Sequence, residues 1–212
     1  MLYLQKGNYQ KIVRFMGGSW MTADQATIFG IIFIFLTAFS YYVGLSNNSY
    51  RWILLLVPVF LFFRLAMNTL DGLLSREHNK ATVAGEILNE TLDVFGDTIC
   101  YGSLLLVPNT PFKSLVIFII LIWAAEFFGV LGKSMPGGIR RHETIAGGKP
   151  DRAVWMGLAA FIIFFYPAFI DYLSYYIFFV SVLVGLTCVI RIRKILQAAK
   201  GKKYKSYTWI GK

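Results

Sequence analysis

Cysteine and histidine are scarce in this sequence, with two residues of each among 212. Cys100 and Cys188 both fall within apolar stretches, which indicates small buried residues and not a disulfide framework. With so few nitrogen and sulfur ligands, a zinc site is disfavoured as well. Negative charge is also in short supply, because eleven acidic residues stand against twenty-one basic ones and leave a net charge of +10.

The composition is too apolar for a soluble domain of this length. Hydrophobic residues make up 57% of the chain and aromatic residues 17%. Several apolar runs approach the roughly 20 residues that a helix needs to cross a bilayer. We therefore expect an all-α membrane protein whose six transmembrane helices lie at about 26–44, 52–74, 84–107, 114–132, 153–173 and 175–190, the last two joined by a tight turn at 171–174.

The chain reads as a single integral membrane domain, with the six-helix core at 26–190 between two basic segments. Residues 1–25 set Lys6, Lys11 and Arg14 among apolar side chains without a continuous apolar core. This pattern favours an interfacial amphipathic helix over a signal peptide. The polybasic, aromatic tail at 191–212 is typical of a surface anchor for anionic membrane lipids.

Basic residues are distributed unevenly between the two sides of the expected bundle. The first, third and fifth connections hold only Arg51 and Lys113, whereas the other connections and the two ends hold eighteen basic residues. The positive-inside rule therefore predicts that both termini are cytoplasmic. Because the basic residues flank apolar spans, we expect anionic lipids or anionic substrates as partners and no nucleic acid.

The stretch 68–97 holds six of the eleven acidic residues, at the expected cytoplasmic ends of the second and third helices. Ionisable groups are expensive at membrane depth and usually mark a functional site. Asn68 and Asp71 are three residues apart, and Asn89, Asp93 and Asp97 recur every four residues, so each set shares a helix face. Oxygen ligands on two antiparallel helices suit a hard cation such as Mg²⁺ or Mn²⁺.

Three further residues of this stretch are suited to a phosphorylated ligand. Gly72 and Gly85 allow a ligand or a neighbouring helix to approach the backbone closely. Arg76, one turn beyond Gly72, can hold a phosphate through paired hydrogen bonds.

This stretch resembles the signature of the CDP-alcohol phosphotransferase family, D-x-x-D-G-x-x-A-R, eight residues, then G-x-x-x-D-x-x-x-D. The spacing matches throughout, and the resemblance is strongest over 64–97. The corresponding residues here are Asn68, Asp71, Gly72, Ser75, Arg76, Gly85, Asn89 and Asp93.

The resemblance implies a homodimeric six-helix protein with a cytoplasmic-facing polar cavity in a bacterial inner membrane. It implies that divalent metal, Mg²⁺ or Mn²⁺, bridges the pyrophosphate of a CDP-linked lipid such as CDP-diacylglycerol while an alcohol displaces CMP. By position, Asn68, Asp71, Asn89 and Asp93 would be metal ligands, and Asp93 would also be the catalytic base. Gly72, Ser75, Arg76 and Gly85 would contact the nucleotide and phosphates.

The chain departs from the signature at three positions. Asn68 and Asn89 replace aspartates, and Ser75 replaces alanine. An amide oxygen can ligate Mg²⁺, but the site loses two negative charges, which leaves open whether one metal binds or two. Glu90 and Asp97, outside the signature, could compensate for the lost charge.

The chain also resembles a bacterial subgroup of this family, which has the same asparagine substitutions, an acidic residue in the fourth helix and a later G-K-x-D-R. The corresponding residues here are Glu126 and 148–152. Glu126 lies within an apolar span, where it either hydrogen-bonds a neighbouring helix, with Arg64 as one candidate, or has a functional role in binding the acceptor or supporting the metal ligands. Lys149 and Arg152 are predicted to hold a small polar or anionic alcohol acceptor.

The segment before the first helix has two interpretations. Thr22 or Asp24 can act as the helix N-cap. By the resemblance, Thr27 lies near the nucleotide.

The leading functional hypothesis is a membrane transferase of phospholipid biosynthesis that moves a phosphatidyl-type group to an alcohol. The first alternative is a relative of weak or absent activity that binds CDP-lipid or metal without turnover, motivated by the two missing carboxylates. The second is a small transporter, for which no inverted repeat is visible.

Overall fold

The computed structural model describes residues 15, 21–77, 82–139 and 147–202, with the side chains of 75–77 left out. Long helices dominate this part of the chain, in the order α2 (Ala23–Ser46), α3 (Leu56–Glu77), α4 (Val83–Gly102), α5 (Phe112–Ser134), α6 (Lys149–Phe165) and α7 (Phe169–Ala199). Two 3₁₀ segments, η2 (Asn48–Leu55) and η3 (Ser103–Leu106), lie before α3 and after α4. The all-α prediction is confirmed.

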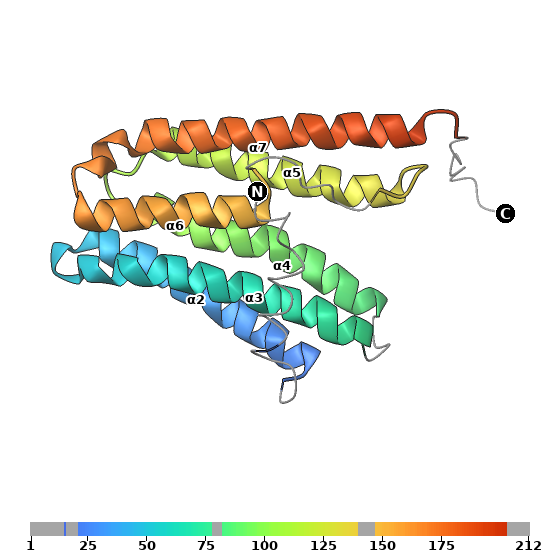
Figure 1. Cartoon of the computed structure of the whole chain (residues 1–212). Coiled ribbons are helices and arrows are strands. Elements are labelled where there is room, and N and C mark those ends of the chain that lie inside the picture. Colours follow the sequence, from blue (N-terminus) through green and yellow to red (C-terminus); the bar gives the residue numbers. More distant parts are fainter. Residues whose placement is uncertain (1–14, 16–20, 78–81, 140–146, 203–212) are drawn as a thin grey trace.

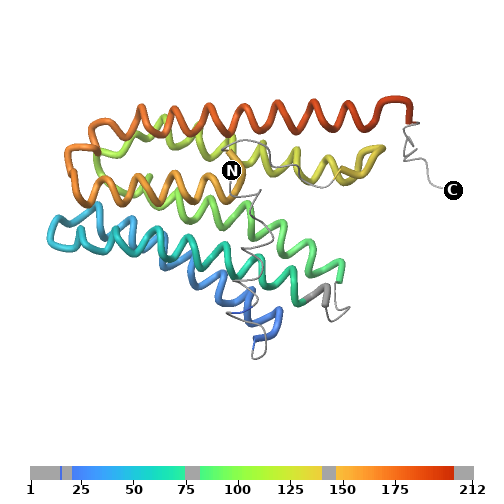
Figure 2. Tube along the Cα trace, viewed as in Figure 1, coloured from blue at the N-terminus to red at the C-terminus, as the bar shows by residue number. Residues whose placement is uncertain are grey.

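The helices run up and down along one long direction, and successive helices are antiparallel (Figure 1). Tracing the tube in Figure 2 shows that α2, α4 and α6 end at one end of the bundle, while α3 and α5 end towards the other. The main packing partners are α2 with α3, α5 with α7, α4 with α2 and α5, and α3 with α6. Because α6 also packs on α7, these contacts join the six helices into a closed ring.

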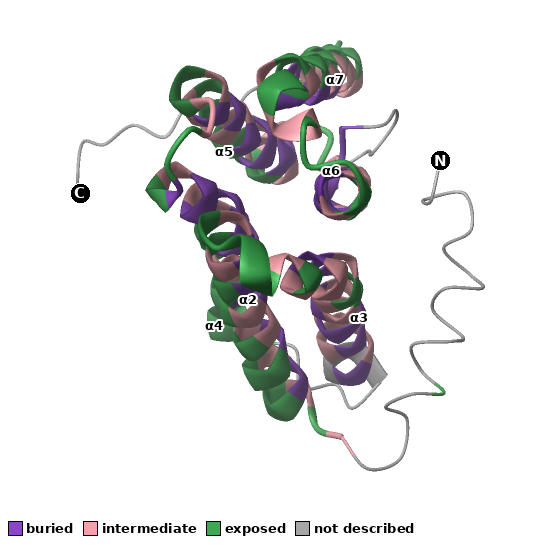
Figure 3. Cartoon of the chain, turned by 90° about the vertical axis from the view of Figure 1, so that its left-hand side faces the viewer, coloured by how far each residue is buried: buried purple, intermediate pink, exposed green. Residues whose placement is uncertain are grey.

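Four helices of the described residues are long and apolar enough to cross a membrane: Ala23–Ser46, Asn48–Leu74, Phe112–Ser134 and Phe169–Ala199. Their buried faces turn inward and their exposed faces outward (Figure 3). The outward faces are rich in large apolar side chains, among them Phe35, Phe39, Phe127 and Phe178. Helices that are apolar all round in this way are typical of membrane spans.

The other two expected spans do not meet the same requirements. Helix α6 has 17 residues and is short for a crossing. Helix α4 contains Glu86, Glu90, Asp93 and Asp97, which lower its hydropathy. Both helices exist, so the part of the chain that the structure describes contains all six of the expected long helices, but the number of membrane crossings stays a prediction.

The predicted boundary between the last two helices is wrong. Helix α6 ends at Phe165, not near residue 173, and α7 already begins at Phe169, so the expected turn at 171–174 is helical. Pro167 is the physical reason, because it cannot continue a helix and moves the preceding Tyr166 out of the helical region, to φ −130° and ψ 84°. Helix α7 also continues beyond the predicted end at Ile190, to Ala199.

The local sequence explains where α2, α4 and α6 begin. Thr22 caps α2 in a reciprocal capping box with Gln25, so Thr22 and not Asp24 is the cap. Thr82 caps α4 by accepting a hydrogen bond from the Gly85 amide at 3.0 Å. Pro150 lies in the first turn of α6, where its missing N–H costs nothing.

Candidate functional site

Three polar side chains from three helices meet between α3, α4 and α6. Asn68 of α3 donates a hydrogen bond from Nδ2 to Oδ1 of Asp93 on α4, at 2.8 Å. Lys149, the first residue of α6, donates from Nζ to the same Oδ1. Asp93 is 4% exposed and Lys149 is 7% exposed. We call Asn68, Asp93 and Lys149 the polar tier.

One helical turn deeper, three more charged residues meet across the same helices. Arg64 Nη1 lies 2.6 Å from Asp97 Oδ1, and Arg152 approaches Asp97 Oδ2 from the other side, with Nη2 at 2.8 Å and Nε at 3.1 Å. All three side chains are at most 1% exposed. Arg64, Asp97 and Arg152 form the ionic tier, in which one carboxylate joins α3 to α6.

The ionic tier continues to the far side of the bundle. Arg152 Nη2 also donates to Glu126 Oε1 of α5 at 2.8 Å. Arg191 of α7 lies 4.0 Å from the same oxygen and donates to the backbone carbonyl of Ala125. Three guanidinium groups and two carboxylates thus connect five helices and are all buried. Removal of either carboxylate would leave buried guanidinium groups without a counter-charge, which is strongly destabilising.

The two tiers follow the antiparallel register of α3 and α4. The pair Arg64–Asp97 and the pair Asn68–Asp93 are four residues apart on both helices, which is one turn. A further turn in the same direction brings Asp71 to the level of Asn89. We call the facing polar residues of α3 and α4 at these three levels the polar column. Asp71 and Asn89 are half-buried, so the column becomes more exposed towards the end of α3 and the start of α4.

Glycines let neighbouring backbones approach this column. A Cβ at Gly30 of α2 would lie 3.2 Å from Asn68 Oδ1, and one at Gly96 of α4 would lie 2.7 Å from Arg64 Nη2. A Cβ at Gly147 would lie 2.3 Å from the carbonyl oxygen of Leu183 on α7. The chain entering α6 therefore packs directly on α7, two residues before Lys149.

The structure brings together some of the predicted site residues and gives others different partners. Asn68 and Asp93 are in contact. Glu126 pairs with Arg152, whereas Arg64, suggested as its partner, pairs with Asp97. Asp97 is engaged on both oxygens by arginines, so it adds no net negative charge to the polar tier.

Glu90, the other residue expected to compensate for lost charge, belongs to a separate surface cluster. Lys133 of α5 lies 2.6 Å from Glu90 and 2.5 Å from Glu86. This places the Glu90 side chain on the α5 side of α4, in keeping with its position about 100° around the helix from Asn89.

The residues expected at the nucleotide are spread over three helices. Thr27 is half-buried on α2 and donates to the Ala23 carbonyl at 3.2 Å. Gly72 is half-buried on α3, and Gly85 is exposed in the first turn of α4. Ser75 and Arg76 belong to α3, but their side chains lie outside the described part, as do 1–14, 16–20 and 203–212 of the expected terminal segments.

The donor set near the polar tier is unusual for a metal centre. Among the described residues, no group of three or more His, Cys, Asp or Glu could hold a metal ion. The candidate ligands are two carboxylates, Asp71 and Asp93, and two amides, Asn68 and Asn89. Such oxygen donors fit a single hard cation, and the amides bring no charge for a second.

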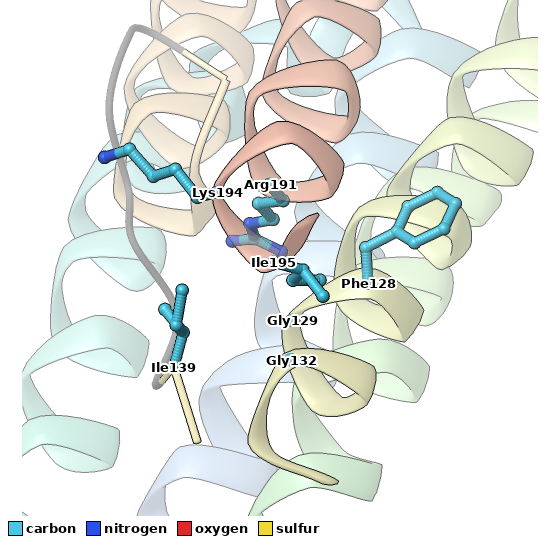
Figure 4. A pocket seen from close by; sticks show the side chains of 7 residues that line it. All are labelled: Phe128, Gly129, Gly132, Ile139, Arg191, Lys194 and Ile195. Atoms are coloured by element: carbon cyan, nitrogen blue, oxygen red, sulfur yellow. The ribbon is translucent and has the colours of Figure 1, made fainter. Parts of the chain in front are cut away.

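Sequence analysis missed Arg191, which it counted with the basic tail. A signal was present, because 184, 187, 188 and 191 repeat at helical spacing and all four are buried on α7. Arg191 also lines a small pocket between α5 and α7 with Lys194, Gly129 and Gly132 (Figure 4). The pocket lies beside the outer member of the ionic network and does not include the polar tier.

The fold has clear counterparts among solved structures. Phosphatidylinositol phosphate synthase (PgsA1) of Mycobacterium tuberculosis with CDP-DAG bound superposes with a TM-score of 0.62 at 17% identity, over 93% of this chain and 98% of that one. Its complex with manganese and citrate gives 0.69 at 19% identity, over 93% of each chain. Identities this low show a shared fold.

Sequence comparison gives a nearer relative. No family model matches the chain. The inner membrane protein YnbA of Escherichia coli strain K12 is 31% identical over 201 residues, which cover 92% of this chain and 96% of that protein. At that identity over nearly the whole of both chains, this protein belongs to the same family as the Escherichia coli inner membrane protein YnbA.

Proposed function

We propose that the chain is a membrane-embedded CDP-alcohol phosphotransferase, which transfers a phosphatidyl-type group from a CDP-linked lipid to an alcohol and releases CMP. The observation that carries the proposal is the contact between Asn68 and Asp93, which unites the two halves of the signature across α3 and α4. The fold shared with PgsA1, which binds CDP-DAG, supports the same donor class.

The residues present fit one divalent cation, for which Asp71, Asp93, Asn68 and Asn89 would supply the oxygens. Such a cation would neutralise the pyrophosphate of the donor and the charge of the leaving CMP. The manganese in the PgsA1 complex supports Mn²⁺ or Mg²⁺ as the metal.

The chain's own groups would act mainly by positioning and electrostatics. Asp93 would orient the acceptor hydroxyl and take its proton. Gly72 and Gly85 would admit the nucleotide, and Arg76 would hold a phosphate. Ser75 and Thr27 remain weaker candidates for nucleotide contacts.

The acceptor would enter beside Lys149, which is adjacent to Asp93. Arg152 and Glu126, also considered for the acceptor, are fully buried and bonded to each other, so we assign them to holding α5 and α6 in place. The class of acceptor remains a polar or anionic alcohol.

The membrane arrangement is part of the proposal. We propose that α4 and α6 complete six crossings, that both termini and the polar tier face the cytoplasm, and that two chains form a homodimer. The uneven distribution of basic residues supports the orientation and suits contact with anionic lipids.

The direct test is metal-dependent CMP release by purified protein supplied with CDP-diacylglycerol and a panel of alcohols. We expect release with Mg²⁺ or Mn²⁺ and none after chelation. Asp93→Asn and Asp71→Asn should each reduce release about 100-fold or more. Asp171→Asn, an exposed carboxylate in the first turn of α7, is the matched control and should release CMP like wild type. Full activity of Asp93→Asn would remove Asp93 from the mechanism.

The second candidate is a protein that holds CDP-lipid or metal without turnover. It is motivated by the ammonium and amide groups that already engage Asp93 and by the two amides in the signature. Saturable binding of CDP-diacylglycerol, with no CMP release for any alcohol, would favour this candidate. A transporter would be recognised by solute flux in liposomes.

A further inference from the structure

We infer that the ammonium group of Lys149 is a permanent cation of the site, so that the polar tier accepts one divalent metal ion and not a pair. The inference rests on the proposed function, because the metal concerned is the one assigned there to the CDP-lipid. It goes beyond that function because Lys149 of α6 would supply the positive charge that a second metal ion would otherwise supply.

One carboxylate oxygen of Asp93 already accepts two hydrogen bonds. Lys149 and Asn68 both donate to Oδ1, and a carboxylate oxygen has about two lone-pair positions. Two metals that used both oxygens of Asp93 would have to displace these donors. Displacing Lys149, a buried residue, would leave its ammonium group without a carboxylate, at a large cost.

The candidate ligands carry too little negative charge for two divalent ions. The four candidate ligands include only two carboxylates, Asp71 and Asp93, because Asn68 and Asn89 are neutral. Paired metal ions lie about 3.5–4 Å apart. Two divalent ions and Lys149 together would place five positive charges against two negative ones, whereas one ion and Lys149 place three. The diphosphate of the donor can balance the smaller excess.

Lys149 is fixed in position by the chain on both sides of it. Its backbone follows Gly147, where a Cβ would lie 2.3 Å from the Leu183 carbonyl oxygen, so this part of the chain is in close contact with α7. One turn later, Arg152 is held by Asp97 and Glu126. A lysine anchored on both sides differs from a surface lysine, which could turn into solvent.

The test counts metal ions directly. Full-length protein in detergent with bound CDP-diacylglycerol is titrated with Mn²⁺, and bound metal is measured by elemental analysis and electron paramagnetic resonance. We expect one Mn²⁺ per chain with an uncoupled six-line spectrum. Asn68→Asp/Asn89→Asp/Lys149→Met should bind two, with the broadened spectrum of coupled ions. Two Mn²⁺ in the wild type would overturn the inference.

Single substitutions test Lys149 itself. Lys149→Met keeps the length of the side chain but removes its charge, so Mn²⁺ should bind about tenfold more tightly or better. Lys149→Arg keeps the charge and should bind Mn²⁺ as wild type does. Lys113→Met, at an exposed position of α5, is the control. Unchanged Mn²⁺ affinity in a folded Lys149→Met would also overturn the inference.

The result is separable from the proposed function, because CMP release is measured on the same samples. One Mn²⁺ per chain without CMP release would refute the transferase and support the role of Lys149. Two Mn²⁺ with CMP release would support the transferase and refute the role of Lys149. Absence of Mn²⁺ from every variant would overturn both.

Discussion

Arg152 donates two hydrogen bonds to a single oxygen of Asp97, from Nη2 at 2.8 Å and from Nε at 3.1 Å. Both side chains are at most 1% exposed. A buried ion pair adds little net stability, but the loss of one partner leaves the other as an uncompensated charge. The cost of breaking this pair therefore measures how dry the interior of the bundle is.

Asp97→Asn should be the most destabilising of the conservative carboxylate substitutions. It removes the charge that faces both Arg64 and Arg152, and we expect a loss of about 3–5 kcal/mol in the free energy of unfolding. Denaturant titration in micelles, followed by circular dichroism, measures it. Asp171→Asn should cost under about 1 kcal/mol, since that carboxylate is exposed at a helix start. Equal losses would mean that the ionic tier is hydrated.

Arg152→Lys should behave as a disruptive change although the charge is retained. A lysine cannot bond Asp97 twice and reach Glu126 with the same group, because it lacks the planar fork of arginine. We expect a loss of about 2–4 kcal/mol in the same unfolding assay. Arg193→Lys, at an exposed position of α7, is the comparison and should be close to neutral. Near-neutral behaviour of Arg152→Lys would contradict the bridging geometry.

Lys133→Ala should have a small effect despite two short contacts. Lys133 is 26% exposed and its partner Glu86 is 52% exposed, so solvent screens both interactions. We expect less than about 1 kcal/mol, decreasing with added salt. A loss as large as that of Asp97→Asn would show that Glu86 and Glu90 are shielded from water, for instance by a second chain.

Gly147→Ala should perturb the entry to α6. The added methyl group would meet the Leu183 carbonyl oxygen at 2.3 Å, and backbone cannot move aside cheaply. We expect about 1–3 kcal/mol of destabilisation. Gly185→Ala on α7, where the new Cβ would meet nothing within 4 Å apart from the adjacent backbone of its own helix, should be neutral or slightly stabilising. The two thermal unfolding curves are compared directly, and coincident curves would refute the contact.

The long helices were predictable from the sequence, because apolar runs of this length have few alternatives to a helix. The starts and ends of α2 and α5 lie within a few residues of those expected. The last two helices were misplaced because Pro167 is followed by a further apolar run, and Asp171 was taken as a turn residue. Asp171 instead occupies the first turn of α7, where a carboxylate suits the helix dipole.

The site was predictable only within each helix. Spacing predicted that Asn68 and Asp71 share one helix face and that Asn89, Asp93 and Asp97 share another, because residues three or four apart lie on one face. The structure brings one residue of each set, Asn68 and Asp93, into contact. Partners between distant helices depend on how those helices pack, which spacing does not encode. This is why Arg64 was named as a candidate partner of Glu126 and why the link from Arg152 through Glu126 to Arg191 was not foreseen.

The one-turn repeat of the contacts between α3 and α4 limits how this protein can move. If α3 slid along its axis by one turn, about 5.4 Å, Arg64 would arrive opposite Asp93 and compete with Lys149. Asp97 would then face Phe60, which can offer a carboxylate nothing. Sliding of α3 by one turn is therefore disfavoured electrostatically, and we expect any movement of α3 to be a tilt or rotation that keeps Arg64 opposite Asp97 and Asn68 opposite Asp93.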